Sequence, residues 1–481
     1  MSFCLGHYRS VPVIAALLTA VLFASGCGRP HPDRPNVIII SIGSLRADHL
    51  GCYGYGRTTS PNIDSLAGDA FLFEEAYSAA NWAAPSDMTM LTSLYPSVHG
   101  VNGHPAPGVL GRDIKTLPEY LKASGYYTAG FYYGDDLSPA HGFDRGFDRY
   151  ERKDFIRPEL GEALSLMDSR RSAKAPFFLF MHVGDVHYPY MAASQKDARY
   201  AKLYGPDYTG PIKEGGPEEW AALEERLADS DDTSDSPDLR HIVGLYDGAI
   251  NYTDKYLGEL VKGLKDKGLY DDTVIVLLSD HGEEFGEHGR FGHEQVYREG
   301  LHVPLIVRFP SWVSERAGYG APRRIDALAG LIDLVPTLLE TLGVEFKSTH
   351  EGVSLAGILR GEAAARSTVY AESEQKAKFL HFIKPGERPG ATARDKENGT
   401  GLYSRLFRSQ KTVIGGGYQY LRFSNASNGG PDLSQLFDYR ADPEERHDVE
   451  PSRQEVAAGL AGELDKAVKQ CATARKEAYK Q

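Results

Sequence analysis

Alternation between apolar strand-like runs and helical patterns constrains this chain more than any other feature of its sequence. Continuous runs rich in β-branched and aromatic residues lie at residues 35–42, 126–133, 176–183, 273–280 and 303–309. Such runs are typical of strands that are covered on both faces. Helical patterns separate several of them, at residues 62–71, 117–125 and 247–268. The alternation predicts a doubly wound α/β fold, with a mixed, mostly parallel sheet and helices on both faces.

The domain organisation follows from where this pattern ends. We expect the α/β domain to span residues 35–366. Shorter extended patterns and a helix from about residue 454 follow, which predicts a small C-terminal α+β subdomain with an antiparallel sheet over residues 367–481. A chain of 481 residues with 41% hydrophobic content can bury a core of this size. Its net charge of −13 argues against nucleic-acid binding, because such a surface repels a phosphate backbone.

The N-terminal residues have the pattern of a bacterial lipoprotein export signal. Arg9 precedes an apolar run too short to span a bilayer, and the small residues 24–26 lead to Cys27. This pattern predicts a signal peptide over residues 1–26, lipidation of Cys27 and a tether over residues 27–34. We therefore expect a protein of the bacterial cell envelope, on the periplasmic or extracytoplasmic face, that contacts the membrane through its lipid anchor only. Whether Cys52 and Cys471 pair stays open, because the sequence gives no measure of their proximity.

The stretch at residues 76–101 contains a helix start suited to an anion. Small residues lead to Pro85 and Ser86, and an apolar helical pattern follows. Proline near the first turn and serine as a cap are typical of a helix N-terminus. Because the first turn presents unpaired N–H groups and the positive end of the helix dipole, it can hold a sulfate or phosphate group.

A series of segments resembles the sulfatase family of the alkaline phosphatase superfamily, in the order in which that family carries them. The matching segments lie at residues 35–67, 91–101, 182–190, 279–307, 331–343, 351–362 and 436–449. The resemblance implies the same α/β fold and, for a typical member, hydrolysis of sulfuric esters at the strand ends. Fold follows family more safely than function does.

The resemblance assigns roles to four residues. Asp280 and His281 match two ligands of the family's metal ion, which is of the calcium type. His187 and His293 match positions whose side chains contact the sulfate or protonate the leaving oxygen, so we expect both to line a pocket.

Four other residues are weaker candidates. His99 and His182 lie in matching segments but carry no firm assignment. Arg46 and Asp48 also match the family, and we interpret them as a pair that supports their loop.

The departures from the family pattern concern its chemistry. Where the nucleophile stands, this chain has Ala83, and a methyl group cannot attack sulfur or phosphorus. Gly43 and Ser44 replace the first metal-binding carboxylates, so we expect a divalent metal of the calcium type to bind weakly or not at all. Asp87 replaces an Arg or His; its charge would repel a bound sulfate by about 4 kcal/mol at ~4 Å and an effective dielectric of 20.

These departures together predict a pseudoenzyme of the sulfatase family. Its expected partner is a glycan, sulfated or phosphorylated, or another component of the cell envelope. The alternative is an active metal-dependent sulfate or phosphate ester hydrolase that uses a relocated nucleophile or an activated water. Ser44 and Ser86 are the hydroxyls available for that alternative, with His187 or His293 as base and Asp87 as a replacement metal ligand. For Ser86 we favour helix capping.

One interval between the matching segments shows neither a helical nor a strand-like hydrophobic pattern. Residues 192–240 are polar, acidic and rich in Gly, Pro and Ser, which favours a solvated loop. Because the interval follows His187 closely, a lid over the pocket is the alternative to a plain surface insertion.

Overall fold

In the computed structural model of the chain, the described residues are 32–103, 107–173, 175–190, 198–205, 207–227, 236–364, 366–374, 409–424 and 432–479. Those from Arg34 onward belong to one compact unit. Cys27 and the predicted signal peptide lie outside the described residues. Within these ranges, no helix has the length and apolar composition needed to cross a membrane.

The centre of the fold is an eight-stranded sheet. Its spatial order is β11 (Arg324–Ile325), β2 (Phe71–Phe73), β10 (Leu305–Arg308), β7 (Thr273–Leu278), β1 (Asn36–Ile42), β6 (Phe177–Val183), β4 (Tyr127–Tyr132) and β5 (Arg149–Arg152). Most neighbouring strands are parallel, and β10 runs antiparallel to both β2 and β7. The five predicted runs form β1, β4, β6, β7 and β10, which confirms the predicted fold class.

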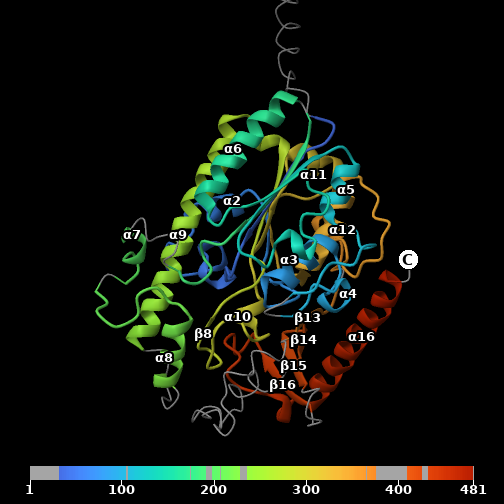
Figure 1. The fold of residues 1–481 in the computed structure, drawn as a ribbon. Helices are drawn as coiled ribbons and strands as arrows, with labels where there is room; N and C mark the ends of the chain where they lie inside the picture. Colours follow the sequence, from blue (N-terminus) through green and yellow to red (C-terminus); the bar gives the residue numbers. More distant parts are fainter. Residues whose placement is uncertain are drawn as a thin grey trace, which may run out of the picture. The chain divides into compact units, whose positions relative to one another are not determined.

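Alternate side chains of each central strand enter two different cores. In β1, Val37 and Ile39 belong to one apolar cluster, whereas Ile38 and Ile40 belong to the other. This is the two-residue period of a strand that is buried on both faces. The first core is covered by α3 (Ala83–Thr92), α5 (Leu117–Ala123), α11 (Ser311–Ala317) and α12 (Leu334–Leu342). The second is covered by α2 (Pro61–Ala67), α6 (Ile156–Ala173) and α9 (Pro237–Asp266), on the other side of the sheet in Figure 1.

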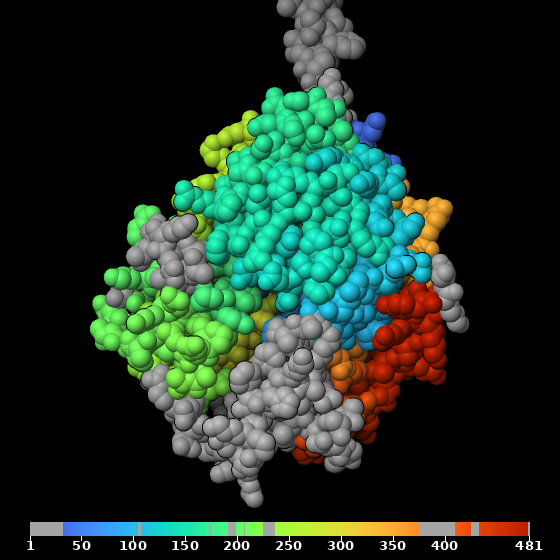
Figure 2. Space-filling model, in the orientation of Figure 1, coloured from blue at the N-terminus to red at the C-terminus, as the bar shows by residue number. Residues whose placement is uncertain are grey.

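A second, antiparallel sheet follows near the C-terminus. It consists of β13 (Val369–Glu374), β14 (Ser409–Gly415), β15 (Tyr418–Ser424) and β16 (Leu433–Asp438), and α16 (Gln454–Ala478) packs against it. The predicted small sheet and terminal helix are therefore present. α16 also packs against α4 (Pro96–His99). In Figure 2 the red C-terminal residues accordingly lie beside blue residues from the N-terminal part of the described chain. Leu464 of α16 and Val413 of β14 belong to the same apolar cluster as residues of the central sheet. The smaller sheet therefore shares a core with the α/β part.

A buried polar network joins the loop after β7 to the segment that follows β16. His288 Nδ1 lies 2.6 Å from Glu299 Oε1, and its Nε2 lies 2.9 Å from the carbonyl oxygen of Glu445. Its ring stacks on Tyr297 at a centroid distance of 3.7 Å. Burial opposes protonation, but the Glu299 carboxylate raises the pKa of His288 to about 9. The hydrogen bond from His288 Nε2 to the Glu445 carbonyl therefore joins the two segments, and the Glu299 carboxylate keeps the imidazole charged.

Candidate functional site

The carboxyl ends of three adjacent parallel strands bring the candidate residues together. β1 pairs with β6 on one side and with β7 on the other. Gly43 directly follows β1, His182 lies near the end of β6, and Asp280 follows β7 by two residues. In an open α/β sheet this edge is where ligands bind.

Helix α3 brings a fourth group to this edge. It begins at Ala83, with Trp82 in extended conformation as the N-cap. Ala83 is partly exposed, whereas Asp87, one turn further on, is fully buried. The predicted helix start is therefore present, with a methyl group at its first position.

Ser86 does not cap this helix, so that prediction was wrong. Trp82 occupies the N-cap position, and Ser86 lies within the helix. The Ser86 hydroxyl donates to the carbonyl oxygen of Asp280 at 2.6 Å and lies 2.7 Å from Ser78 Oγ. It links α3 to the end of β7, and this buried, hydrogen-bonded position does not suit a nucleophile.

An acidic pair and a histidine form the buried floor of the site. His182 Nε2 lies 3.0 Å from Asp280 Oδ2 and 3.3 Å from Asp87 Oδ2. Burial raises the pKa of Asp87 to about 8. Burial opposes ionisation of Asp280 as well, but His281 and His182 hold its pKa well below the usual range. His182, the basic member of this group, is therefore already engaged by two acids.

Next to this floor lie two imidazoles and several aromatic rings, most of them partly exposed, although the His293 side chain itself is buried. His187 Nε2 and His293 Nε2 lie 3.4 Å apart. The Trp82 ring meets His293 edge-on at 4.2 Å, and the Tyr188 ring lies tilted against that of His187 at 4.3 Å. Trp82, His187 and Tyr188 are partly exposed, as is Tyr133, whose ring lies 5.6 Å from that of His187. Burial lowers the pKa of His187 to about 4, so its imidazole is neutral at neutral pH.

Comparison with known proteins decides the family. The sulfatase family model matches residues 35–344. The chain belongs to the sulfatase family. Among its relatives, the N-acetylglucosamine-6-O-sulfatase of Bacteroides thetaiotaomicron is 23% identical and aligns over 92% of this chain and 88% of its own length. The human iduronate 2-sulfatase is 27% identical over 63% of this chain and 65% of its own length.

Solved structures agree on the sulfatase fold. A protein crystallised with its substrate D-glucosamine-2-N,6-O-disulfate has a TM-score of 0.68 at 19% identity, covering 93% of this chain and 100% of its own. The phosphonate monoester hydrolase of Agrobacterium radiobacter has a TM-score of 0.66 at 22% identity, covering 91% and 96%. At these identities the likeness concerns the fold alone.

Sulfatases depend on a metal ion, and the residues present do not fit a calcium-type ion. Such an ion takes about six to eight oxygen ligands, several of them charged. Gly43 offers no side chain, and Ser44 is buried with its backbone in the left-handed region at φ 61°. Asp280 Oδ1 already accepts the N–H groups of Ser44 and His281. A metal ion could be held by Asp87, His182 and Asp280. One of these three donors is a nitrogen, however, and no donor comes from β1 or the residues just after it, so the set does not suit calcium.

The remaining sequence candidates separate into those at the site and those outside it. His281 lies at the site: its Nδ1 donates to the Gly282 carbonyl at 2.8 Å. His99 is buried against Thr89 of α3, where burial lowers its pKa to about 3, so it is a structural residue. Arg46 and Asp48 form the expected pair, with contacts of 2.8 and 2.9 Å.

The interval at 192–240 contains more structure than its composition predicted. Its described residues include α7 (Ala198–Ala201) and α8 (Pro217–Leu227), and α9 begins within it. Trp220 of α8 is 6% exposed and meets the Tyr188 ring edge-on at 4.4 Å. This segment therefore reaches the aromatic part of the site, and α8 lies beside the β8 region in Figure 1. No pattern in the sequence pointed to Trp220, since it sits among glutamates.

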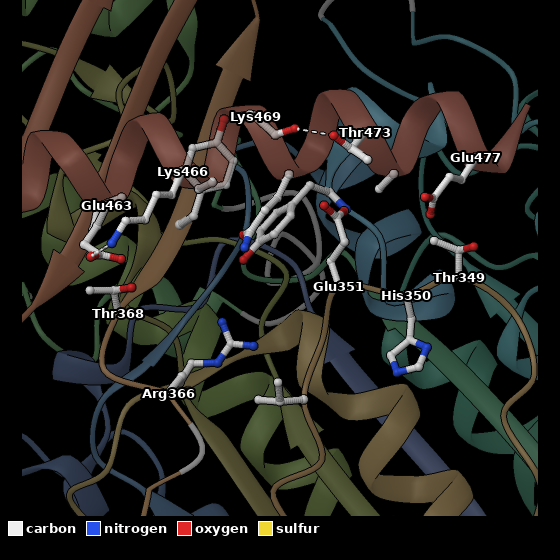
Figure 3. A pocket seen from close by; sticks show the side chains of 17 residues that line it. Thr349, His350, Glu351, Arg366, Thr368, Glu463, Lys466, Lys469, Thr473 and Glu477 are labelled. Carbon is white, nitrogen blue, oxygen red and sulfur yellow. Dashed lines mark hydrogen bonds and ion pairs between the residues drawn. The ribbon is translucent and has the colours of Figure 1, made fainter.

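A cleft lies away from these residues. Its volume is about 770 Å³, and it opens between α16, residues 349–353 and residues 366–370 (Figure 3). Tyr95 lines it from beyond the C-terminal end of α3, whereas Ala83 is at the other end of that helix. The cleft is therefore separate from the candidate site, and its Lys466 is paired with Glu463 at 2.6 Å.

Proposed function

We propose that this sulfatase-family protein is a pseudoenzyme that binds a glycan of the cell envelope without hydrolysing it. The observation that carries this proposal is Ala83 at the first position of α3, where the family pattern has its nucleophile. Covalent catalysis needs an oxygen or sulfur atom at that place, and a methyl group provides neither.

The surroundings of Ala83 support loss of hydrolysis. The buried side chain near it is Asp87, an acid, where the family resemblance places a base. A second acid, Asp280, shares His182 with it. An ester anion entering this floor would meet the ionised Asp280 carboxylate and no basic side chain at position 87, and in a buried site such repulsion amounts to several kcal/mol.

The aromatic part of the site supports binding of a sugar. Trp82, Tyr133 and Tyr188 present partly exposed rings around the neutral His187 imidazole. Such rings offer flat apolar faces for sugar C–H groups, and a neutral imidazole can donate to and accept from hydroxyls. One relative is named N-acetylglucosamine-6-O-sulfatase, after a sulfated sugar. A glycan of the envelope or the extracellular space is therefore the first class of ligand to test.

Anchoring belongs to the same proposal. Lipidation at Cys27 would place the site at the extracytoplasmic face of a bacterial membrane. A Cys27→Ala variant is then released into the soluble fraction in the native host, and an unchanged membrane fraction would contradict the anchor.

The first experiment separates binding from turnover. The purified protein is incubated with sulfate and phosphate mono- and diesters in the presence of several divalent metals, and product release is measured. We expect none, and we expect its melting temperature to be unchanged by added calcium. Hydrolysis in this panel would instead establish the alternative, an ester hydrolase with a relocated nucleophile or an activated water.

The second experiment tests the sugar. Titration calorimetry against neutral and sulfated oligosaccharides should show binding by the wild type. The Trp82→Ala variant should bind with at least tenfold lower affinity. Trp312 is the matched control, because its indole N–H donates to the Asp271 carbonyl away from the site. Equal affinities for wild type, Trp82→Ala and Trp312→Ala, or no binding by wild type, would contradict the proposal.

A further inference from the structure

Three ligand atoms face one another inside the floor of the site. They are Asp87 Oδ2, His182 Nε2 and Asp280 Oδ2, and all lie within 4.8 Å of one another. The three residues are 0%, 2% and 0% exposed. The nitrogen lies 3.0 and 3.3 Å from the two oxygens.

The hydrogen bonds of the described residues leave this group incomplete. Asp87 Oδ1 accepts from Ser41 Oγ at 3.3 Å, whereas its Oδ2 has no hydrogen-bond partner among the residues that the structure describes. Asp280 Oδ1 accepts two backbone N–H groups, so only its Oδ2 faces His182. One proton on His182 Nε2 can be directed at one carboxylate, so the second oxygen stays unpaired in a buried place. A buried polar atom without a hydrogen-bond partner costs about 1–3 kcal/mol.

The neighbouring His281 also has a buried ring nitrogen without a hydrogen-bond partner among the described residues. His281 Nδ1 donates to the Gly282 carbonyl, which leaves Nε2 as a bare lone pair. That nitrogen is fully buried, has no hydrogen-bond partner within the described part of the chain, and lies 3.6 Å from Asp280 Oδ2. A positive ion at this place would satisfy both unpaired atoms.

We propose that Asp87, His182 and Asp280 bind one divalent transition-metal ion of the zinc class. Zinc takes nitrogen and carboxylate ligands in tetrahedral arrangement at about 2.0–2.2 Å, which puts neighbouring ligand atoms about 3.3–3.6 Å apart. The separations of 3.0 and 3.3 Å are close to that spacing. His281 Nε2 is the nearest further donor for the fourth position.

The proposed site differs from the family's calcium-type site in its ligands. Calcium takes oxygen ligands only in its usual protein sites, and about twice as many. Here two ligands come from places the family pattern does not use for metal, α3 and β6, and the first strand contributes none. The other oxygen of each carboxylate is held by Ser41 or by backbone N–H groups, as is common around zinc.

The consequence is structural. One ion would join α3, β6 and the loop after β7 beneath Ala83. Its ligands are closed to solvent, so it needs no role in turnover. This inference goes beyond the proposed glycan binding and stands or falls separately from it.

The experiment uses the whole protein stripped of metal by a chelator and then given Zn²⁺ or Ca²⁺ alone. We expect one equivalent of tightly held Zn²⁺ by metal analysis, a higher melting temperature with Zn²⁺, and no change with Ca²⁺. Asp87→Asn, which keeps the side-chain shape, should weaken Zn²⁺ binding by more than tenfold. The matched control is His447→Gln, since His447 and Asp442 form an exposed pair at 3.1 Å that could bind zinc adventitiously.

Either of two results would overturn the proposal. One is equal Zn²⁺ retention by wild type and Asp87→Asn, and the other is loss of that zinc in His447→Gln. Should Asp87→Asn fail to fold, the visible spectrum of the Co²⁺-loaded wild type decides. Intense bands of a four-coordinate ion support the site, and weak bands of a six-coordinate ion or no retained Co²⁺ refute it. Glycan binding is measured on the same samples, so its failure is seen separately.

Discussion

The buried pair of His288 and Glu299 makes the stability of this protein depend on pH in a calculable way. The pKa of His288 rises from an ordinary 6.5 to about 9 on folding, because Glu299 Oε1 lies 2.6 Å from its Nδ1. At ~1.4 kcal/mol per pKa unit, the pair contributes about 3 kcal/mol. Since the folded pKa is the higher one, this stability is fully present below pH 6.5. It is lost as the pH rises through about 9.

Glu445 acts in the same direction. Burial raises its pKa to about 8, so its ionisation destabilises the folded state as the pH rises from about 4.5 towards 8. We therefore expect the free energy of unfolding to fall between pH 6 and pH 9.5. The test is urea denaturation, followed by circular dichroism, of wild type and His288→Gln at both pH values.

The variant should separate the contribution of the histidine charge. His288→Gln loses the cation beside Glu299, so it should be about 3 kcal/mol less stable than wild type at pH 6 and nearly equal to it at pH 9.5. His447→Gln is the matched control, because its pair with Asp442 is exposed and should contribute under about 1 kcal/mol at either pH. A difference between wild type and His288→Gln that is the same at both pH values would refute this reasoning.

Three further outcomes are expected. Ala83→Ser restores a hydroxyl at the nucleophile position but not the rest of the chemistry, so sulfate release from aryl sulfates should stay at background; measurable release would show that Ala83 alone blocks turnover. Gly43→Ala should change the melting temperature little, because the added Cβ would come no closer than 3.5 Å to another atom. Gly282→Ala should lower the free energy of unfolding, measured in urea, by more than about 2 kcal/mol, because its Cβ would lie 1.9 Å from the Glu299 carbonyl oxygen. Leu464→Ala should lower the free energy of unfolding by about 2–5 kcal/mol in the same assay, since this side chain of α16 is fully buried in the main core. Glu463→Ala on the same helix should lower it by under about 1 kcal/mol.

Much of the fold could be predicted because it follows from local pattern. Runs such as PNVIIISI are typical of strands buried on both faces, and Asn36–Ile42 is such a strand at the centre of the sheet. The antiparallel direction of β10 could not be predicted, because a buried strand reads the same in either direction. The helix α8 was missed because its glutamates and the flanking glycines resemble a solvated loop.

The site could be predicted only where family segments carried it. His187 and His293 were expected to line a pocket; their Nε2 atoms lie 3.4 Å apart, and their role in a pocket stays a prediction. The group of Asp87, His182 and Asp280 was not foreseen as a unit. Its members come from three separate segments, and their meeting depends on the register that sets His182 opposite Ser41. Ser86 was misplaced because helix capping depends on the residue that leaves the helical conformation, which here is Trp82.

The placement of the tryptophans gives this protein a built-in optical reporter. Of its three tryptophans, Trp82 and Trp220 belong to the aromatic part of the site, and only Trp312 lies elsewhere. A sugar that covers the Trp82 ring would dry that indole and shift its emission to shorter wavelength, while Trp312 supplies a constant background. Occupancy could then be followed in an unlabelled sample, at protein concentrations too low for calorimetry.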